Sequence, residues 1–275
     1  MISETWQLVV RDLKKWYRTP AWMVASLVQP VLWLALFGNA FNLANMFPGG
    51  DAAKAALQTD FGGAPNYITF LTGGMLCFLV VTGSMWAGGP LVMDRSLGYL
   101  DKLLATPISR TAVTLSLLIS NVVKGLILTV ILLVVAYALP GGLVVGASFG
   151  ALDLIGIFAT LVLLSVGFLW LFMVVAVRAS KFETLAAIGS TLGLPLLFAS
   201  SALLPVATMP GWLRAIADVN PISKAAEAIR YLLIQGSLNS SAVTAVTGDI
   251  VYLGAFAAVC TAIGVYASKH GLRME

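Results

Sequence analysis

The sequence predicts an all-α integral membrane protein. Hydrophobic residues make up 59% of the 275 residues and charged residues only 10%, which is far from the balance of a soluble domain. The apolar residues also gather in long continuous runs, and they do not alternate with polar residues as the strands of a membrane barrel do. Together these observations predict several membrane-spanning helices.

Six apolar runs are long enough to cross a bilayer, since a spanning helix needs about 20 mainly apolar residues. Charges, prolines and glycine clusters bound the runs. The predicted spans are 21–42, 67–92, 112–139, 150–177, 184–205 and 249–267. We expect the whole chain, 1–275, to form one transmembrane domain.

Residues 1–19, ahead of the first run, predict an amphipathic helix in the membrane interface. Charged residues lie opposite an apolar face with helical spacing. That face consists of Ile2, Trp6, Val9, Val10, Leu13, Trp16 and Tyr17. Pro20 ends this helix and begins the first span. The helix either anchors the chain to lipid or grips a cytoplasmic partner.

Lysine and arginine residues predict the orientation. An even number of spans places both termini on one side, together with the connections 93–111 and 178–183. Eleven basic residues lie on that side and four on the other, so the first side is expected to be cytoplasmic. The eleven are Arg11, Lys14, Lys15, Arg18, Arg95, Lys102, Arg110, Arg178, Lys181, Lys269 and Arg273, and the four are Lys54, Arg214, Lys224 and Arg230.

Cysteine and histidine usage argues against an enzyme. Cys77 and Cys260 both lie within apolar spans and form neither a disulfide framework nor a metal site. His270, the only histidine, stands in the C-terminal tail, so no histidine-based triad is available in the membrane. No GxxxxGK[ST] phosphate loop occurs. We therefore expect no catalytic site, no metal site and no cofactor bound by this chain.

A charged island, MDRSLGYLDKLLATPISR at residues 93–110, separates the second and third spans. Leucines repeat along one side of it, Ser96 is a plausible N-cap, and Thr106 before Pro107 ends the helix. Its polar face is nearly charge-balanced. The island therefore predicts a short amphipathic cytoplasmic helix, which is either a solvated loop helix or a docking surface for a protein partner that covers its leucines.

A second amphipathic helix is predicted between the fifth and sixth spans, within residues 209–236. Asn220 can cap it, Pro221 suits its first turn, and Gly236 suits its C-terminal end. Its apolar face consists of Ile222, Ala225, Ala226, Ile229, Leu232 and Leu233, and its polar face of Lys224, Glu227 and Arg230. On the extracellular side, such a helix would dip into the outer leaflet or lie on it.

The island resembles the cytoplasmic signature of ABC-2 type transporter permeases, which has an acidic-basic pair, a glycine, an acidic residue, a leucine pair and Thr-Pro. The matches are Asp94, Arg95, Gly98, Asp101, Leu103, Leu104, Thr106 and Pro107. Tyr99 replaces the usual threonine, and Asp101 replaces the usual glutamate. Residues 209–236 resemble the drug-export branch of this family, which includes daunorubicin-resistance permeases.

The resemblance implies a membrane subunit of an ATP-driven exporter of hydrophobic drugs or lipid-like molecules, in a prokaryotic plasma or inner membrane with both termini in the cytoplasm. Two copies would pair as a homodimer, and separate ATPase subunits would bind ATP and Mg and dock on the island as a coupling helix. The implied contacts are Asp94, Arg95, Leu97, Gly98, Tyr99, Leu100, Asp101, Leu103, Leu104 and Pro107, with Lys181 in a second contact at 178–183.

Candidates for a translocation path or a dimer seam lie in three spans. Gly189 and Gly193 have the GxxxG spacing of close helix packing, and Gln29 precedes the kink expected at Pro30. Further candidates are Trp33, Phe37 and Lys124. The two aromatic residues offer either a surface for cargo or ordinary core packing, and the lysine either snorkels to the interface or attracts amphiphilic cargo. The extracellular helix is either a structural lid or part of substrate release.

Two other functions stay open. Within the family, the cargo could be a lipid-linked glycan. Outside it, a secondary transporter or channel would predict charged residues at mid-membrane and inverted repeats, and neither is evident, since Asp153 lies near the outer end of the fourth span.

Overall fold

The computed structural model describes residues 2–40, 61–98, 110–179, 181–236 and 240–271, and every regular element in these ranges is helical. The elements are α1 (Ile2–Tyr17), α2 (Pro20–Ala40), α5 (Tyr67–Trp86), α6 (Gly89–Ser96), α8 (Arg110–Ala138), α9 (Ala151–Arg178), α10 (Phe182–Phe198), the short η1 (Val206–Thr208), α11 (Gly211–Val219), α12 (Pro221–Ile234) and α13 (Ser240–Gly271).

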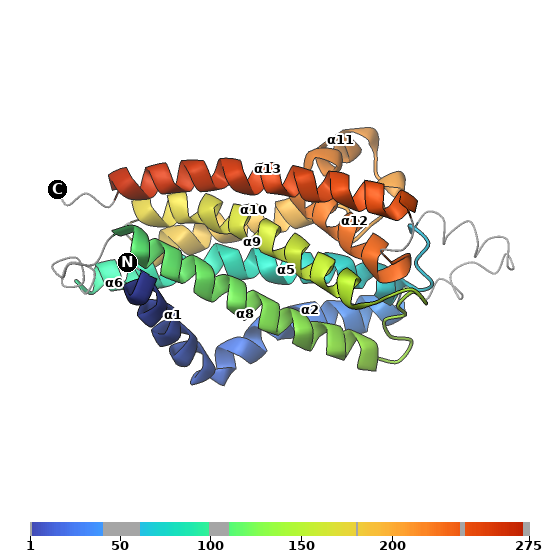
Figure 1. The fold of residues 1–275 in the computed structure, drawn as a ribbon, viewed down its shortest axis with the longest axis horizontal. Helices are drawn as coiled ribbons and strands as arrows, with labels where there is room; N and C mark the ends of the chain where they lie inside the picture. The colour runs from blue at the N-terminus through green and yellow to red at the C-terminus, as the bar shows by residue number, and fades with distance from the viewer. Residues whose placement is uncertain (1, 41–60, 99–109, 180, 237–239, 272–275) are drawn as a thin grey trace, which may run out of the picture.

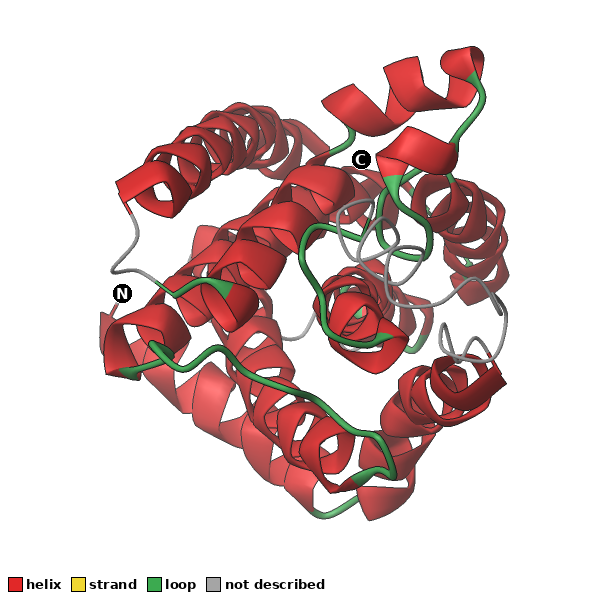
Figure 2. Cartoon of the chain, turned by 90° about the vertical axis from the view of Figure 1, so that its right-hand side faces the viewer, coloured by secondary structure: helices red, strands yellow, loops and turns green. Residues whose placement is uncertain are grey.

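The long helices lie side by side along the longest axis of the molecule (Figure 1). Helix α1 begins and α13 ends at the same end, which we call the terminal end, and the opposite end is the distal end. Figure 2 looks along the bundle from the distal end and shows the long helices end-on. This arrangement gives the protein a single helical bundle, with the short helices α11 and α12 toward the distal end (Figure 1).

Among the described residues, five helical segments are long and apolar enough to cross a membrane. They are Pro20–Gly38, Tyr67–Ser96, Val113–Ala138, Ala151–Arg178 and Val246–Ser268. These segments correspond to five of the six predicted spans, and they establish a multi-pass membrane protein.

The remaining predicted span, 184–205, which is the fifth along the chain, is shorter than expected. Helix α10 ends at Phe198 after 17 residues, so the prediction of a helix through residue 205 is wrong. The side chain of Asn220 explains the ending, because its Nδ2 donates hydrogen bonds to the carbonyl oxygens of Leu196 and Ala199 at 2.8 and 2.9 Å. These bonds satisfy carbonyls that a longer helix would pair internally.

Helix α5 is the core of the bundle. It contacts α2, α8, α9, α10 and α12, and nearly all its side chains are buried. Its sequence is apolar on every side, as expected for a helix surrounded by others. The side chain of Asn66 caps it by accepting a hydrogen bond from the Thr69 amide at 2.8 Å. The groove described below opens along one side of this central helix.

Helix α1 lies where the sequence predicts an interface helix, and α2 begins at Pro20. One side of α1 packs on α8, with Val9 fully buried, while Trp6 and Tyr17 are exposed. The carboxylate of Asp12 pairs with Lys124 of α8. Helix α1 is therefore held to the bundle by packing and by an ion pair, in addition to any contact with lipid.

Candidate functional site

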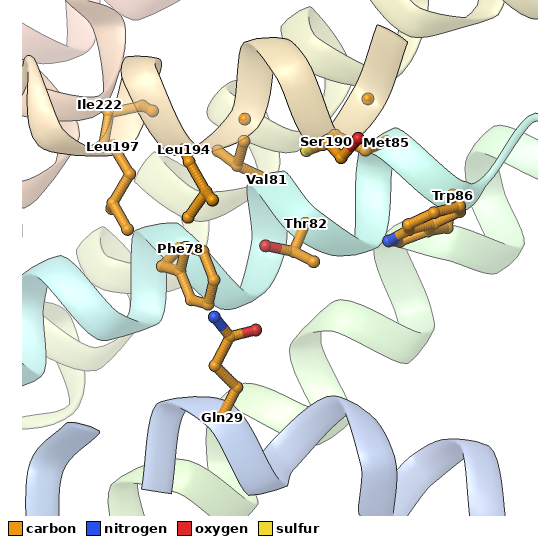
Figure 3. Close-up of a pocket in the computed structure, with 12 residues that line it drawn as sticks. Gln29, Phe78, Val81, Thr82, Met85, Trp86, Ser190, Leu194, Leu197 and Ile222 are labelled. Atoms are coloured by element: carbon orange, nitrogen blue, oxygen red, sulfur yellow. The ribbon is translucent and has the colours of Figure 1, made fainter. Parts of the chain in front are cut away.

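A groove with a volume of about 200 Å³ lies between α2, α5 and α10 (Figure 3). It runs from the middle of α5 toward the terminal end. Its lining consists of Gln29 from α2; Phe78, Val81, Thr82, Met85 and Trp86 from α5; Gly189, Ser190, Gly193, Leu194 and Leu197 from α10; and Ile222 from α12. The surface that it offers is mainly apolar.

The two glycines of α10 allow the groove walls to come close together. A Cβ atom at Gly193 would lie 2.6 Å from Cε of Met85, which is closer than real Cβ atoms come. Gly189 faces the same methionine. The two glycines of the GxxxG motif, which the sequence suggests as part of a translocation path or a dimer seam, thus lie against α5 of the same chain and line the groove.

Three polar side chains interrupt the apolar lining: Gln29, Thr82 and Ser190. The Ser190 hydroxyl donates to the carbonyl oxygen of Ala187 on its own helix at 3.1 Å. Figure 3 shows the Gln29 carboxamide pointing from α2 toward Phe78 and Thr82. Gln29 is exposed, and within the described residues its amide makes no hydrogen bond. The N–H donors and the carbonyl acceptor of this amide are therefore available to a ligand.

The remaining candidates for the path lie outside this groove. The rings of Trp33 and Phe37 stack on each other with centroids 4.7 Å apart, and Trp33 also meets Phe198 at the end of α10. The ammonium group of Lys124 pairs with Asp12 of α1. The aromatic pair therefore packs α2 against α10, and the lysine ties α8 to the interface helix.

Beyond Leu197 of the groove lining, α10 ends and is followed by a buried, non-helical turn, Ser200–Leu203, whose four residues are each no more than 7% exposed. Side chains from two helices hold its backbone. The Ser223 hydroxyl accepts a hydrogen bond from the Ser201 amide at 2.9 Å, and the Tyr67 hydroxyl donates to the Leu203 carbonyl at 2.9 Å. Buried non-helical backbone requires such partners, because water cannot reach its polar groups.

Arg230 of α12 supplies two further hydrogen bonds to the backbone of this turn. The sequence places it on the polar face of α12, and that prediction is wrong, because the side chain is only 6% exposed. Its Nη2 donates to the carbonyl oxygens of Ser201 and Ala202 at 2.7 and 3.1 Å, and its Nε donates to that of Phe70 at 2.9 Å. The guanidinium also lies 3.6 Å from the centroid of the Phe70 ring.

No described carboxylate forms a salt bridge with Arg230, so carbonyl dipoles and an aromatic face solvate its charge. The guanidinium stays cationic at neutral pH, because an arginine side chain does not lose its proton in proteins. Gly74 of α5 makes the arrangement possible, because a Cβ there would lie 2.0 Å from the Ala202 oxygen. Arg230 thus links α12, α5 and the end of α10.

The rest of α12 follows the sequence pattern. Asn220 is its N-cap and accepts a hydrogen bond from the Ile222 amide at 2.9 Å, Pro221 is its first residue, and Gly236 has a φ of +70°. The predicted apolar face is buried against α5, α9 and α13. Glu227 stays partly exposed, and its Oε2 lies 3.8 Å from Nζ of Lys224.

At the terminal end, the described part of the charged island stops at Gly98. Ser96 lies in the last turn of α6 and its hydroxyl donates to the Met93 carbonyl, so the prediction of an N-cap there is wrong. Leu97 is 76% exposed, and Gly98 has a φ of +65°. The other implied coupling residues, Tyr99, Leu100, Asp101, Leu103, Leu104 and Pro107, lie outside the described residues and stay predictions.

Arg95 joins the two predicted coupling contacts. Its Nη1 donates to the carbonyl oxygens of Val177 and Ala179 at 2.8 and 3.3 Å, at the end of α9. The next described residue, Lys181, is exposed and is the N-cap residue of α10. The ring of Phe182 stacks on the ring of Trp86, which lines the groove, with ring centroids 6.0 Å apart. The start of the island therefore contacts the 178–183 connection directly.

Asp94 faces the interface helix. Arg11 and Lys15 of α1 lie within electrostatic reach of its carboxylate, and Arg11 and Asp94 border the same small cavity between α1, α6 and α8. The described residues contain no cluster of three His, Cys, Asp or Glu side chains that could hold a metal ion. The terminal end is thus built from ionic and apolar contacts between helices.

Sequence reasoning missed two features. The α5 wall of the groove, with Phe78, Met85 and Trp86, carries no signal beyond apolar composition. The Arg230 network carries one weak signal, since an arginine one helical turn beyond a glutamate suggests a surface pair. The adjacent glycines 73 and 74 of α5 were the better indication, because paired glycines permit a neighbouring backbone to approach.

These features define the class: a helical multi-pass membrane protein with an apolar groove along its central helix. The chain belongs to the ABC-2 type transporter family, which it matches over residues 3–234. It is 35% identical over 237 residues to the "Putative transport permease ycf38" of Pyropia yezoensis. This alignment covers 84% of this chain and 74% of the relative.

Two further relatives carry drug-resistance names. The daunorubicin resistance ABC transporter permease protein DrrB1 of Streptomyces coeruleorubidus is 27% identical over 234 residues, with 84% of this chain and 75% of the relative covered. The probable doxorubicin resistance ABC transporter permease protein DrrC of Mycobacterium tuberculosis is 24% identical over 264 residues, with coverage of 94% and 86%.

Proposed function

We propose that this protein is the membrane subunit of an ATP-driven exporter that moves hydrophobic or lipid-like molecules across a cell membrane. Membership of the ABC-2 type transporter family supports the subunit role, and the names of the DrrB1 and DrrC relatives favour drug-like cargo. In this proposal, ATP and Mg bind to a separate cytoplasmic ATPase subunit, and this chain performs no hydrolysis.

The observation that carries the proposal is the continuous path from the terminal end to the groove. Arg95 of α6 grips the carbonyls at the end of α9, and α10 starts three residues later and forms one wall of the groove. Displacement of the island by a docked ATPase would therefore move α10 relative to α5. Such a movement changes the width of the groove, as coupling of hydrolysis to transport requires.

The terminal end faces the cytoplasm in this proposal, because the sequence assigns eleven lysine and arginine residues to the side of the two termini and four to the other side. Helix α10 and the buried turn after it would make the fifth crossing along the chain, with Arg230 solvating the non-helical part. The membrane is the plasma or inner membrane of a prokaryotic cell. Helices α11 and α12 then belong to the outer half of the protein.

A second copy of the chain would complete the pathway. Pockets that enclose drug-sized ligands measure roughly 300–1,000 Å³, and the groove of about 200 Å³ is smaller than that. Two copies placed with their grooves facing each other would enclose a larger space, which supports a homodimer.

The test uses inside-out vesicles that contain the protein with its ATPase. Replacing Leu100 and Leu103 together by Asp should abolish cargo uptake and cargo-stimulated hydrolysis, because charged side chains cannot enter an apolar docking surface. Membrane insertion should be unchanged. Leu152→Asp, at an exposed leucine of the distal end, is the matched control and should keep both activities. Full activity of the double variant would remove the island from the mechanism.

A further inference from the structure

The groove contains no charged side chain in the lining that the structure describes. Seven of its twelve residues are aliphatic or aromatic hydrophobic side chains or methionine, and two more are glycines. The other three carry an amide or a hydroxyl. A permanently charged group entering this space would lose hydration without meeting an opposite charge, and that loss is large in a low-dielectric environment.

Of the three polar side chains in the lining, Gln29 has the largest number of hydrogen-bonding groups to offer a ligand. Its carboxamide can donate two hydrogen bonds and accept two, and none is made to another described residue. The Ser190 hydroxyl, by contrast, already donates to its own helix. An amide that points into an apolar groove (Figure 3) gains most from a ligand with a neutral hydrogen-bonding group of its own.

We propose that the groove binds uncharged apolar molecules that carry an amide-like hydrogen-bonding group, with Gln29 as the residue that reads that group. This inference rests on the proposed function and names the class of cargo. The aliphatic and aromatic body of the ligand would pack against the apolar side chains of α5 and α10. Cations and anions of the same size are excluded for lack of a counter-charge.

The experiment compares three probes that share one apolar body. They are 4-hexylbenzamide, 4-hexylbenzoate and 4-hexylbenzyl-trimethylammonium, which share the 4-hexylphenyl group and carry a neutral, an anionic or a cationic head. Binding to the purified chain in lipid nanodiscs is measured from the rise in unfolding temperature with probe concentration, and empty nanodiscs correct for partition into lipid. We expect the benzamide to bind at least tenfold more tightly than either charged probe.

Four variants, one of them a control, locate the binding site and identify the residue that contacts the head group. Gly193→Leu should abolish binding of the benzamide, because its side chain fills the groove against Met85. Gly254→Leu, on a part of α13 with no atoms nearby, is the matched control and should leave binding unchanged. Gln29→Leu should weaken benzamide binding about fivefold, as the loss of one hydrogen bond does. Gln29→Glu should shift the preference to the ammonium probe.

The possible failures are distinct from a failure of the proposed function. Equal binding of all three probes, blocked by Gly193→Leu, would overturn the cargo class while leaving the groove as the cargo site. Absence of binding by any probe, or binding unaffected by Gly193→Leu, would overturn the assignment of the groove itself. Neither result depends on the ATPase subunit, which the coupling variants test separately.

Discussion

Arg230 is a cation held inside the protein without a carboxylate partner, at the junction of three elements. Arg230 stabilises the fold by donating hydrogen bonds to carbonyl groups of the turn Ser200–Leu203, because this turn is buried and its carbonyls cannot bond to water. This explains why a charged residue is tolerated in the interior of the protein. It also makes Arg230 a sensitive position for the stability of the turn that follows α10.

Replacing Arg230 by Met should lower the free energy of unfolding by about 2–4 kcal/mol, since the Ser201 and Ala202 carbonyls lose their donors. Denaturation with sodium dodecyl sulfate in mixed micelles measures the change. Lys224→Met, on the same helix but partly exposed, should cost less than about 1 kcal/mol. Equal costs for the two variants would mean that Arg230 does not hold the turn.

Gly74→Ala tests the close approach of that turn to α5. The added methyl group would collide with the Ala202 oxygen, so we expect a loss of about 1–3 kcal/mol in the same assay. Gly254→Ala makes the same change where no atom lies nearby, and its better helix propensity should stabilise the protein by up to about 1 kcal/mol. A neutral Gly74→Ala would show that the turn does not contact the helix.

The sequence predicts the local roles of residues better than their surroundings. Asn220, Pro221 and Gly236 stand where capping rules put them, because capping depends on the backbone of the same segment. Arg230 was assigned to the wrong face because α5, distant in sequence, decides what covers it. Ser96 was assigned as a cap because a leucine repeat follows it, whereas the chain continues as α6 up to that residue.

At the scale of elements, α1 and α8 are joined by the pair Asp12–Lys124, which is mostly buried. Reversing either charge alone should destabilise the protein, because two like charges then face each other. The double variant Asp12→Lys with Lys124→Asp should recover most of the loss, with a coupling energy of about 1 kcal/mol or more. Thermal unfolding of the four proteins measures it, and strictly additive losses would argue against the pair.

Apolar run length located five of the membrane-crossing helices within a few residues, because hydrophobic length is a property of the sequence itself. Run length overestimated the length of α10, since residues 199–205 are as apolar as a membrane-spanning helix. What ends the helix is the Asn220 side chain from a later segment, together with the hydrogen bonds that hold Ser200–Leu203. Continuous hydrophobicity could not distinguish a helix from a buried turn.

At the scale of the whole molecule, the groove could be predicted only in part. Gln29, Gly189 and Gly193 were candidates from sequence and do line it, whereas Trp33, Phe37 and Lys124 serve helix packing. The distinction depends on which helices become neighbours, and composition does not encode that. The family membership and the groove together support a membrane subunit whose cargo route runs beside α5.

Purification from native membranes in mild detergent would show whether this chain works with a separate ATPase. Mass spectrometry of the intact assembly and an ATPase assay would follow. We expect two copies of this chain with two nucleotide-binding subunits, and hydrolysis that vanadate inhibits. A chain that purifies without any ATPase subunit, and without hydrolysis, would rule out the proposed function and favour transport driven by an ion gradient.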